Sequence, residues 1–171
     1  MMQLLIGGNG LIGTAVRREM ERRYLTGTGP PFRVTTRRES DADDGWILYR
    51  LGENPDQLPP ATVVYLVAAK PGFAACEGSA ESWVVNVDAQ IAIARRFKRM
   101  AFVVYVSSDA VETCGVTAYA RQKAQVESYI QSINGAIVRP TRVSAERAGD
   151  LASLFINVGL ARNPGVYRWK P

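Results

Sequence analysis

The chain has 171 residues, of which 47% are hydrophobic and 22% are charged, and its formal net charge is +5. These proportions are typical of one globular domain, and the lack of a long apolar run or a signal-peptide pattern predicts a cytoplasmic protein without a membrane helix. The absence of histidine excludes Ser-His-Asp hydrolysis and histidine acid–base catalysis, and two cysteines, Cys76 and Cys114, are too few for a disulfide scaffold.

The first part of the chain alternates predicted strands with a predicted helix. We expect strands over Gln3–Ile6 and Phe32–Thr36, with a helix over Leu11–Arg23 between them, because apolar residues recur there with helical spacing. A third strand is predicted over Ile47–Leu51. Ala61–Ala69 is a nearly continuous apolar run, which is typical of a strand buried on both faces of a parallel sheet.

The second part continues the alternation. Helices are predicted over Ser82–Arg99 and Thr117–Ile133, the latter with Thr117 as its N-cap, and a last helix over Asp150–Arg162. Buried strands are predicted over Ala101–Val106 and Ala136–Val138. Strands that alternate with helices predict an α/β fold, and we expect a single Rossmann-type domain over residues 1–171, a doubly wound parallel sheet with helices on both faces.

A glycine-rich loop joins the first strand to the first helix. Gly8, Gly10 and Gly13 fit the pattern G-x-G-x-x-G, and Gly7 adds a second register, G-x-x-G-x-x-G. Glycines between a strand and a helix allow a sharp turn and a close approach of the backbone to a pyrophosphate at the helix N-terminus. The loop therefore predicts dinucleotide binding, and the alternative is a glycine-rich turn that holds no ligand.

The end of the second strand bears on which dinucleotide is bound. NAD-binding domains place an acidic residue there for the ribose 2′-hydroxyl, whereas this chain has Arg37 and Arg38, with the first acid at Glu39. A guanidinium suits a 2′-phosphate, so we favour NADP over NAD. The alternative is that both arginines are merely solvated.

Tyr119 and Lys123 lie four residues apart and share a face of the Thr117–Ile133 helix. The positive end of the helix and the lysine cation both favour the phenolate, so we expect a lowered Tyr119 pKa and a role for Tyr119 as a general acid or base. Ser108 follows a buried strand at the sheet edge where ligands bind, and it can meet Tyr119 over a bound nicotinamide. The alternative is a set of three ordinary polar residues.

Other charged groups receive simpler interpretations. Asp41, Asp43 and Asp44 have no partner histidine or carboxylate cluster, so no metal site is predicted. The basic residues form clusters on separate elements without an aromatic platform, so nucleic-acid binding ranks last among the functions considered.

Together these motifs resemble the short-chain dehydrogenase/reductase superfamily. The segments IGGNGLIG, TTRR, LVAA, VVNVDA, VSSDAV, YARQK and IVRPTRV follow one another in the order of its extended, epimerase/dehydratase type. Their spacing is most similar to that of dTDP-4-dehydrorhamnose reductases. The resemblance covers nearly the whole chain.

The resemblance implies a role for each matching position. Ser108 would orient a substrate carbonyl, Tyr119 would transfer a proton, and Lys123 would bind the nicotinamide ribose. The remaining implied contacts to the cofactor are made by Gly7, Asn9, Gly10, Leu11, Ile12, Gly13, Arg37, Arg38, Ala68, Ala69, Pro140 and Thr141. The implied activity is hydride transfer on a nucleotide sugar or another small carbonyl compound, in a homodimer that pairs the Ser82–Arg99 and Thr117–Ile133 helices.

Two departures keep a second hypothesis open. Only ten residues separate Ser108 from Tyr119, and 30 residues follow Thr141, fewer than in the family, whose C-terminal part completes the sheet and builds the substrate-binding region. We therefore expect that region to be largely absent here. The alternative to an enzyme is a non-catalytic dinucleotide-binding module that regulates or scaffolds.

Overall fold

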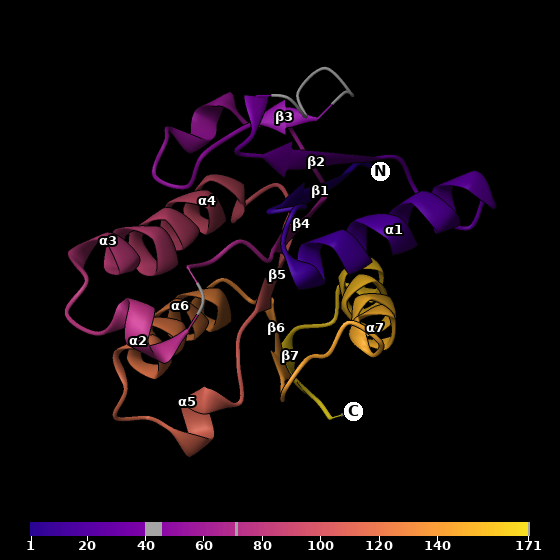
Figure 1. Cartoon of the computed structure of the whole chain (residues 1–171). Coiled ribbons are helices and arrows are strands. Elements are labelled where there is room, and N and C mark those ends of the chain that lie inside the picture. The colour runs from indigo at the N-terminus through magenta and orange to yellow at the C-terminus, as the bar shows by residue number, and fades with distance from the viewer. Residues whose placement is uncertain (40–45, 71, 171) are drawn as a thin grey trace.

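The computed structural model describes residues 1–39, 46–70 and 72–170. A seven-stranded parallel sheet runs through the centre in the order β3-β2-β1-β4-β5-β6-β7 (Figure 1). The strands are β1 (Gln3–Ile6), β2 (Phe32–Thr36), β3 (Ile47–Leu48), β4 (Val63–Leu66), β5 (Phe102–Val106), β6 (Ala136–Pro140) and β7 (Gly165–Trp169).

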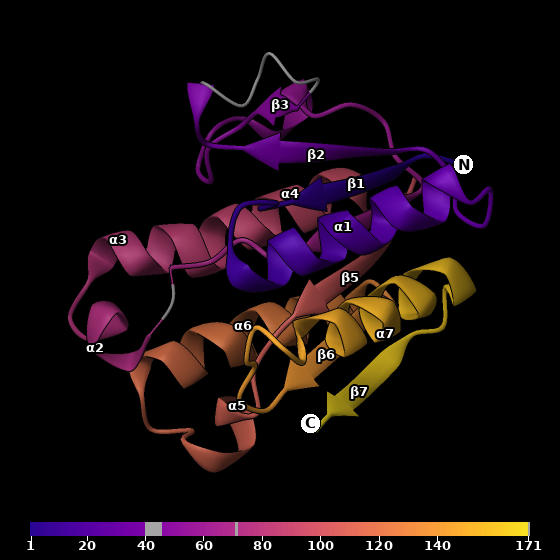
Figure 2. The ribbon, with the colours of Figure 1, turned by 45° about the vertical axis from the view of Figure 1, so that its right-hand side comes forward.

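Helices cover both faces of this sheet (Figure 2). One face carries α1 (Leu11–Leu25) and α7 (Ala148–Ala161), and the other carries α4 (Ala89–Phe97) and α6 (Ala118–Ser132). The short elements are α2 (Phe73–Cys76), α3 (Ala80–Trp83), α5 (Ala110–Thr113), the 3₁₀ turn η2 (Pro55–Gln57) and the π-helical turn η3 (Val84–Asp88). No helix in the described part of the chain has the length and apolar character needed to cross a bilayer.

The core has two layers because successive strand residues point to opposite faces. In β1, Leu4 packs in the layer under α4 and α6, while Leu5 packs in the layer under α1 and α7. In β4, Val64 and Tyr65 divide in the same way. The nearly continuous apolar run of β4 is therefore explained by burial on both faces, and the predicted α/β fold class is confirmed.

Some predicted boundaries differ from the structure. The Ser82–Arg99 helix is divided into α3, η3 and α4, and the strand predicted over Ala61–Ala69 ends at Leu66 because Val67 and Ala68 turn to the Ile6 carbonyl. Strand β7 was not predicted at all. It is a partly exposed edge strand, so its residues lack a clear alternation of apolar and polar side chains.

The residues after Thr141 form α7 and strand β7. Residues 136–140 of β6 pair with residues 165–169 of β7 along the whole length of both strands. The residues after Thr141 therefore complete this edge of the sheet.

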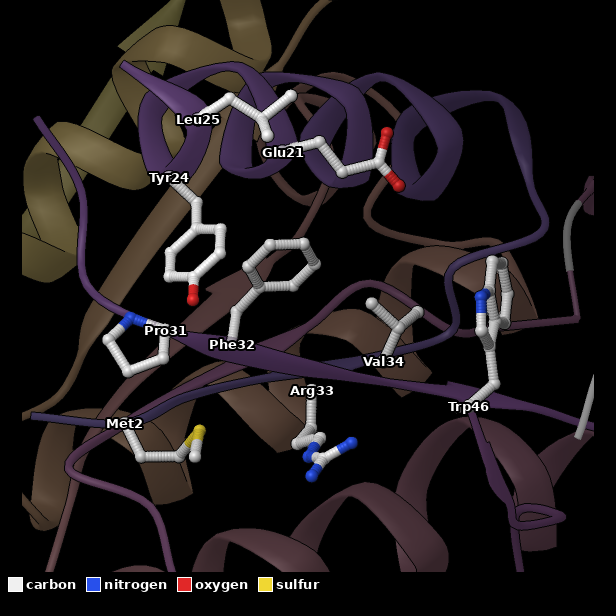
Figure 3. Close-up of a pocket in the computed structure, with 9 residues that line it drawn as sticks. All are labelled: Met2, Glu21, Tyr24, Leu25, Pro31, Phe32, Arg33, Val34 and Trp46. Atoms are coloured by element: carbon white, nitrogen blue, oxygen red, sulfur yellow. The ribbon is translucent and has the colours of Figure 1, made fainter. Parts of the chain in front are cut away.

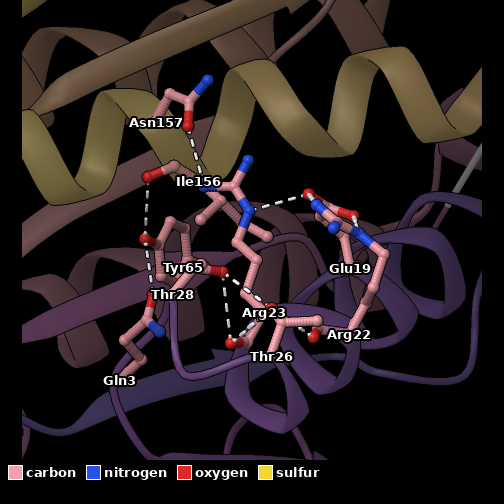
Figure 4. A network of polar contacts seen from close by, with 9 residues as sticks. All are labelled: Gln3, Glu19, Arg22, Arg23, Thr26, Thr28, Tyr65, Ile156 and Asn157. Carbon is pink, nitrogen blue, oxygen red and sulfur yellow. Dashed lines mark hydrogen bonds and ion pairs between the residues drawn. The ribbon is translucent and has the colours of Figure 1, made fainter.

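Polar contacts fasten α7 to α1 and to the sheet (Figure 4). Arg23 of α1 donates to Asn157 of α7 at 2.7 Å and to Glu19 at 2.7 Å. The buried Tyr65 hydroxyl of β4 has two acceptors within hydrogen-bond distance, Gln3 Oε1 of β1 at 2.9 Å and the Ile156 carbonyl of α7 at 3.3 Å. This network holds the two helices against one face of the sheet.

Gly159 of α7 packs directly on the Tyr65 ring. A Cβ atom at position 159 would lie 2.3 Å from the Tyr65 hydroxyl oxygen, whereas a Cβ at Gly149 of the same helix meets nothing within 4 Å. We expect Gly159→Ala to lower the free energy of unfolding by about 1–3 kcal/mol because the buried ring has no room to move. Gly149→Ala is the control and should be neutral or stabilising by up to about 1 kcal/mol in urea unfolding. Equal stability of the two variants would contradict this packing.

Candidate functional site

The glycine loop follows β1, and three of its glycines, Gly7, Gly8 and Gly13, pack closely against other parts of the fold; a Cβ at Gly8 would lie 2.3 Å from Val34 Cγ1. Gly7 has a φ of +98°, and a Cβ there would lie 2.5 Å from the Ala68 Cβ. A Cβ at Gly13, in the first turn of α1, would lie 1.9 Å from the Gly7 carbonyl oxygen. The loop and the helix therefore approach more closely than any side chain allows.

Gly10 has no such structural requirement. It is the residue before α1, its φ of −78° suits any residue, and a Cβ there would meet nothing within 4 Å. As the N-cap residue, Gly10 offers no side chain to cap α1, whose first amide groups and dipole favour a negative charge. The missing side chain at Gly10 thus leaves open space in front of a helix end suited to phosphate.

A cleft of about 710 Å³ begins at this helix end and crosses the carboxyl ends of β4, β5 and β6. The strand order reverses between β1 and β4, which is where ligands bind in doubly wound sheets. The predicted site residues that line the cleft are Gly10, Leu11, Ile12, Gly13, Ala69, Ser108, Tyr119, Lys123, Pro140 and Thr141.

The other predicted cofactor residues lie outside the cleft lining. Gly7 and Ala68 are in contact beneath the loop, and Asn9 lies in its turn. Arg37 and Arg38 are exposed at the end of β2. The end of β2 that precedes them lies beside the glycine loop, because the Thr35 hydroxyl accepts a hydrogen bond from the Gly7 amide at 3.0 Å.

Ser108, Tyr119 and Lys123 are brought together at the far end of the cleft. Thr117 accepts a hydrogen bond from the Ala120 amide at 3.2 Å, which confirms it as the N-cap of α6 and places Tyr119 in the first turn. Ser108 accepts a hydrogen bond from the Ala110 amide at 3.2 Å and lines the cleft together with Tyr119. The Lys123 ammonium donates to the Val106 carbonyl at 3.0 Å and lies 5.7 Å from the centre of the Tyr119 ring.

The predicted lowering of the Tyr119 pKa is wrong. Burial raises the pKa of Tyr119 above its usual value of 10, and the neighbouring Ser108 hydroxyl opposes this only in part. Lys123 does not offset the burial, because it is itself buried and its pKa is lowered to about 8. Loss of hydration outweighs the cation and the helix end, so the phenol is protonated at neutral pH in the free protein.

Part of this burial comes from a segment that sequence reasoning did not include in the site. Phe73 of α2 packs edge-to-face on Tyr119 with 5.4 Å between ring centres, and it lines the cleft. Glu77 fixes the same segment to α6 by accepting from the Ala118 amide at 2.7 Å. Arg142, which is exposed, also lines the cleft. Phe73 belongs to none of the quoted motifs, and Arg142 lies in the segment IVRPTRV but was given no role there, so the tertiary structure is what places both at the cleft.

A buried amide connects the cleft wall with α6. Asn86 lies on the π-helical turn η3, accepts from the Lys70 amide at 2.7 Å and donates to the Lys70 carbonyl at 3.0 Å. It also donates to Gln122 at 2.9 Å, next to Lys123 in the chain. The β4–α2 connection and the helix that carries Tyr119 are therefore held by one side chain.

A second cavity of about 470 Å³ lies between α1 and β2 (Figure 3). The side chains of Phe32, Val34 and Trp46 extend from the sheet toward α1 around it. It contains none of the predicted site residues.

The acidic residues Asp41, Asp43 and Asp44 lie outside the described residues.

Comparison with known proteins adds information at the level of structure. No protein-family model and no curated protein matches this sequence. The structure is similar to a hypothetical dTDP-4-dehydrorhamnose reductase from Sulfolobus tokodaii, with a TM-score of 0.79 and 18% identity over 98% of this chain and 76% of the other. A dTDP-4-dehydrorhamnose reductase from Clostridium acetobutylicum has a TM-score of 0.75 and 19% identity over 99% and 74%.

A UDP-glucose 4-epimerase from Thermus thermophilus, solved in complex with NAD, is similar with a TM-score of 0.74 and 17% identity over 98% of this chain and 77% of the epimerase. At sequence identities this low, the structural similarity establishes a shared fold and nothing further. The chain therefore has the Rossmann-type fold of these reductases and epimerases, as its resemblance to the extended short-chain dehydrogenase/reductase superfamily implies.

Proposed function

We propose that this chain binds NADP(H) and catalyses hydride transfer on a nucleotide sugar or another small carbonyl substrate. The observation that carries the proposal is a single cleft that joins the open α1 N-terminus at Gly10 to Ser108, Tyr119 and Lys123. A helix end suited to pyrophosphate thus lies in one cavity with a proton donor and a buried cation.

The chain's own residues have separate tasks in this proposal. The nicotinamide, when bound, supplies or accepts the hydride. Ser108 hydrogen-bonds the substrate oxygen and orients the carbonyl, and the Tyr119 hydroxyl gives that oxygen its proton. Lys123 provides positive charge beside the site from a position fixed by the Val106 carbonyl.

The raised pKa of Tyr119 supports the reductive direction. A phenol that stays protonated at neutral pH can donate a proton to an oxygen that gains negative charge. Removal of a proton from an alcohol would need the phenolate, which burial disfavours. We therefore propose carbonyl reduction as the main activity.

The substrate class is supported by the solved structures that share the fold. Their names describe reductases, epimerases and a dehydratase that act on nucleotide-linked sugars. In this chain the open side of the cleft carries the Phe73 ring and the exposed Arg142, a surface that suits a ring with an attached anionic group.

Calorimetric titration with NADPH and NADH tests cofactor binding. We expect NADPH to bind more tightly than NADH, and Arg37→Ala to reduce that preference by about tenfold because a charge-assisted bond to the 2′-phosphate is lost. Gly10→Val should weaken both nucleotides, because its side chain would occupy the open space in front of α1. Arg18→Ala, on the exposed side of α1, is the control. Failure of the wild-type chain to bind either nucleotide would overturn the proposal.

A second candidate is a dinucleotide-binding module without catalytic activity. It is favoured by the packing of Phe73 on the Tyr119 ring, which covers the proton donor in the free protein. The two candidates differ in one measurement. A module would bind NADPH but show no oxidation of it, followed at 340 nm, with any nucleotide-linked keto sugar or small ketone.

We also propose a homodimer formed through the helical face that carries α3, η3, α4 and α6. Trp83 and Val84 are 43% and 47% exposed there, which leaves apolar surface available on the element that the resemblance places in the interface. Light scattering at micromolar concentration should give twice the chain mass of 18.7 kDa. Trp83→Arg should then produce monomers, and a monomeric wild-type protein would contradict the proposal.

A further inference from the structure

Ser107 is a buried residue of the cleft for which neither motif nor resemblance gives a role. It directly follows β5, its exposed fraction is 3%, and it lines the cleft. Its amide donates to the Val138 carbonyl at 2.8 Å, which fixes the backbone. Its hydroxyl has no hydrogen-bond partner in the described part of the chain.

A buried hydroxyl without a partner is uncommon, because it loses its hydration and gains nothing in return. Ser82 shows the usual arrangement. It is fully buried, donates to the Ser79 carbonyl at 2.8 Å, and accepts from Gln122 at 2.7 Å. Gln90 and Tyr105 also bury an unpaired oxygen, but neither lines the cleft.

The position of Ser107 indicates which part of a ligand it would meet. The preceding residue, Val106, holds the Lys123 ammonium through its carbonyl, and the following residue, Ser108, lines the cleft together with Tyr119. The glycine loop, where pyrophosphate would bind, is at the other end of the cleft. Ser107 is therefore at the reacting end.

We infer that the Ser107 hydroxyl binds the nicotinamide carboxamide of the cofactor, an inference that rests on the proposed function. A hydroxyl both donates and accepts, and so does a carboxamide, while neither group carries a charge. Because the hydroxyl gives up no partner in the protein, it can rotate about Cα–Cβ to a ligand at the cost of a rotamer change alone. Ser107 thus favours cofactors with an intact nicotinamide over fragments that lack it.

The test compares Ser107→Ala with the wild-type chain using two nucleotides. NADP⁺ carries the carboxamide, and 2′-phospho-ADP-ribose lacks the nicotinamide but keeps the rest. By calorimetry we expect Ser107→Ala to weaken NADP⁺ about three- to tenfold, the value of one neutral hydrogen bond, and to leave the fragment unchanged. Equal affinity of the variant and the wild type for NADP⁺, or equal weakening of both nucleotides, would overturn the inference.

Thermal unfolding of the unliganded protein gives an independent readout. Ser107→Ala removes an unpaired hydroxyl, so its midpoint should equal that of the wild type or exceed it by about 2 °C. Ser82→Ala, which breaks existing bonds, should lower the midpoint. A drop for Ser107→Ala as large as that for Ser82→Ala would overturn the inference. A wild-type chain that binds neither nucleotide overturns the proposed function itself, which separates the two failures.

Discussion

Replacing Tyr119 with phenylalanine should lower turnover of a carbonyl substrate by about 10²–10⁴-fold, the usual contribution of a positioned acid. The ring and its edge-to-face contact with Phe73 remain, so the fold and the cleft are kept. NADPH affinity should stay within a few-fold of the wild-type value, since the substitution removes one hydroxyl. The measurement is NADPH oxidation at 340 nm beside a calorimetric titration.

Tyr129→Phe is the matched control, because Tyr129 lies on the same helix and outside the cleft. It should turn over substrate like the wild type. In the wild type the reductive rate should be level through neutral pH and fall as the pH passes the raised pKa of Tyr119, where the donor is lost. Full activity of Tyr119→Phe would show that another group donates the proton.

Replacing Lys123 with methionine should stabilise the unliganded protein at pH 7 by about 2–3 kcal/mol, although it removes the positive charge that Lys123 provides beside the site. The buried ammonium has one hydrogen bond, to the Val106 carbonyl, and burial lowers its pKa from 10.5 to about 8. At pH 7 the folded chain must therefore hold a charge that its surroundings disfavour. Methionine has a similar length and no charge. The measurement is the free energy of unfolding in urea.

The free energy of unfolding should depend on pH in a direction that the lowered pKa of Lys123 determines. Between about pH 8 and 10.5 the unfolded chain still binds the Lys123 proton while the folded chain has released it, so this residue makes the wild type more stable as pH rises. Lys123→Met should lack this rise between pH 8 and 9.5. Lys98→Met, at an exposed position after α4, should keep it. A Lys123→Met variant that is less stable than the wild type at pH 7 would show that the bond to Val106 outweighs the cost of burial.

These two residues also show why the site could be predicted only in part. The spacing of Tyr119 and Lys123 and the N-cap at Thr117 are local features, and the structure contains the helix they indicate. The pKa of Tyr119 was predicted in the wrong direction, because it depends on burial beneath Phe73, which comes from a different connection of the sheet. Desolvation is a property of the packed chain.

Apolar periodicity and glycine positions act over a few residues, so the alternation of strands and helices, and with it the parallel sheet, could be predicted from the amino-acid order. The tertiary structure added which atoms Gly7 and Gly13 pack against, Ala68 and the Gly7 carbonyl, and that Gly10 faces open space. It alone added β7, whose residues pair with β6 but carry no pattern of their own. The burial of the Ser107 hydroxyl without a hydrogen-bond partner among the described residues likewise depends on contacts between elements distant in the chain.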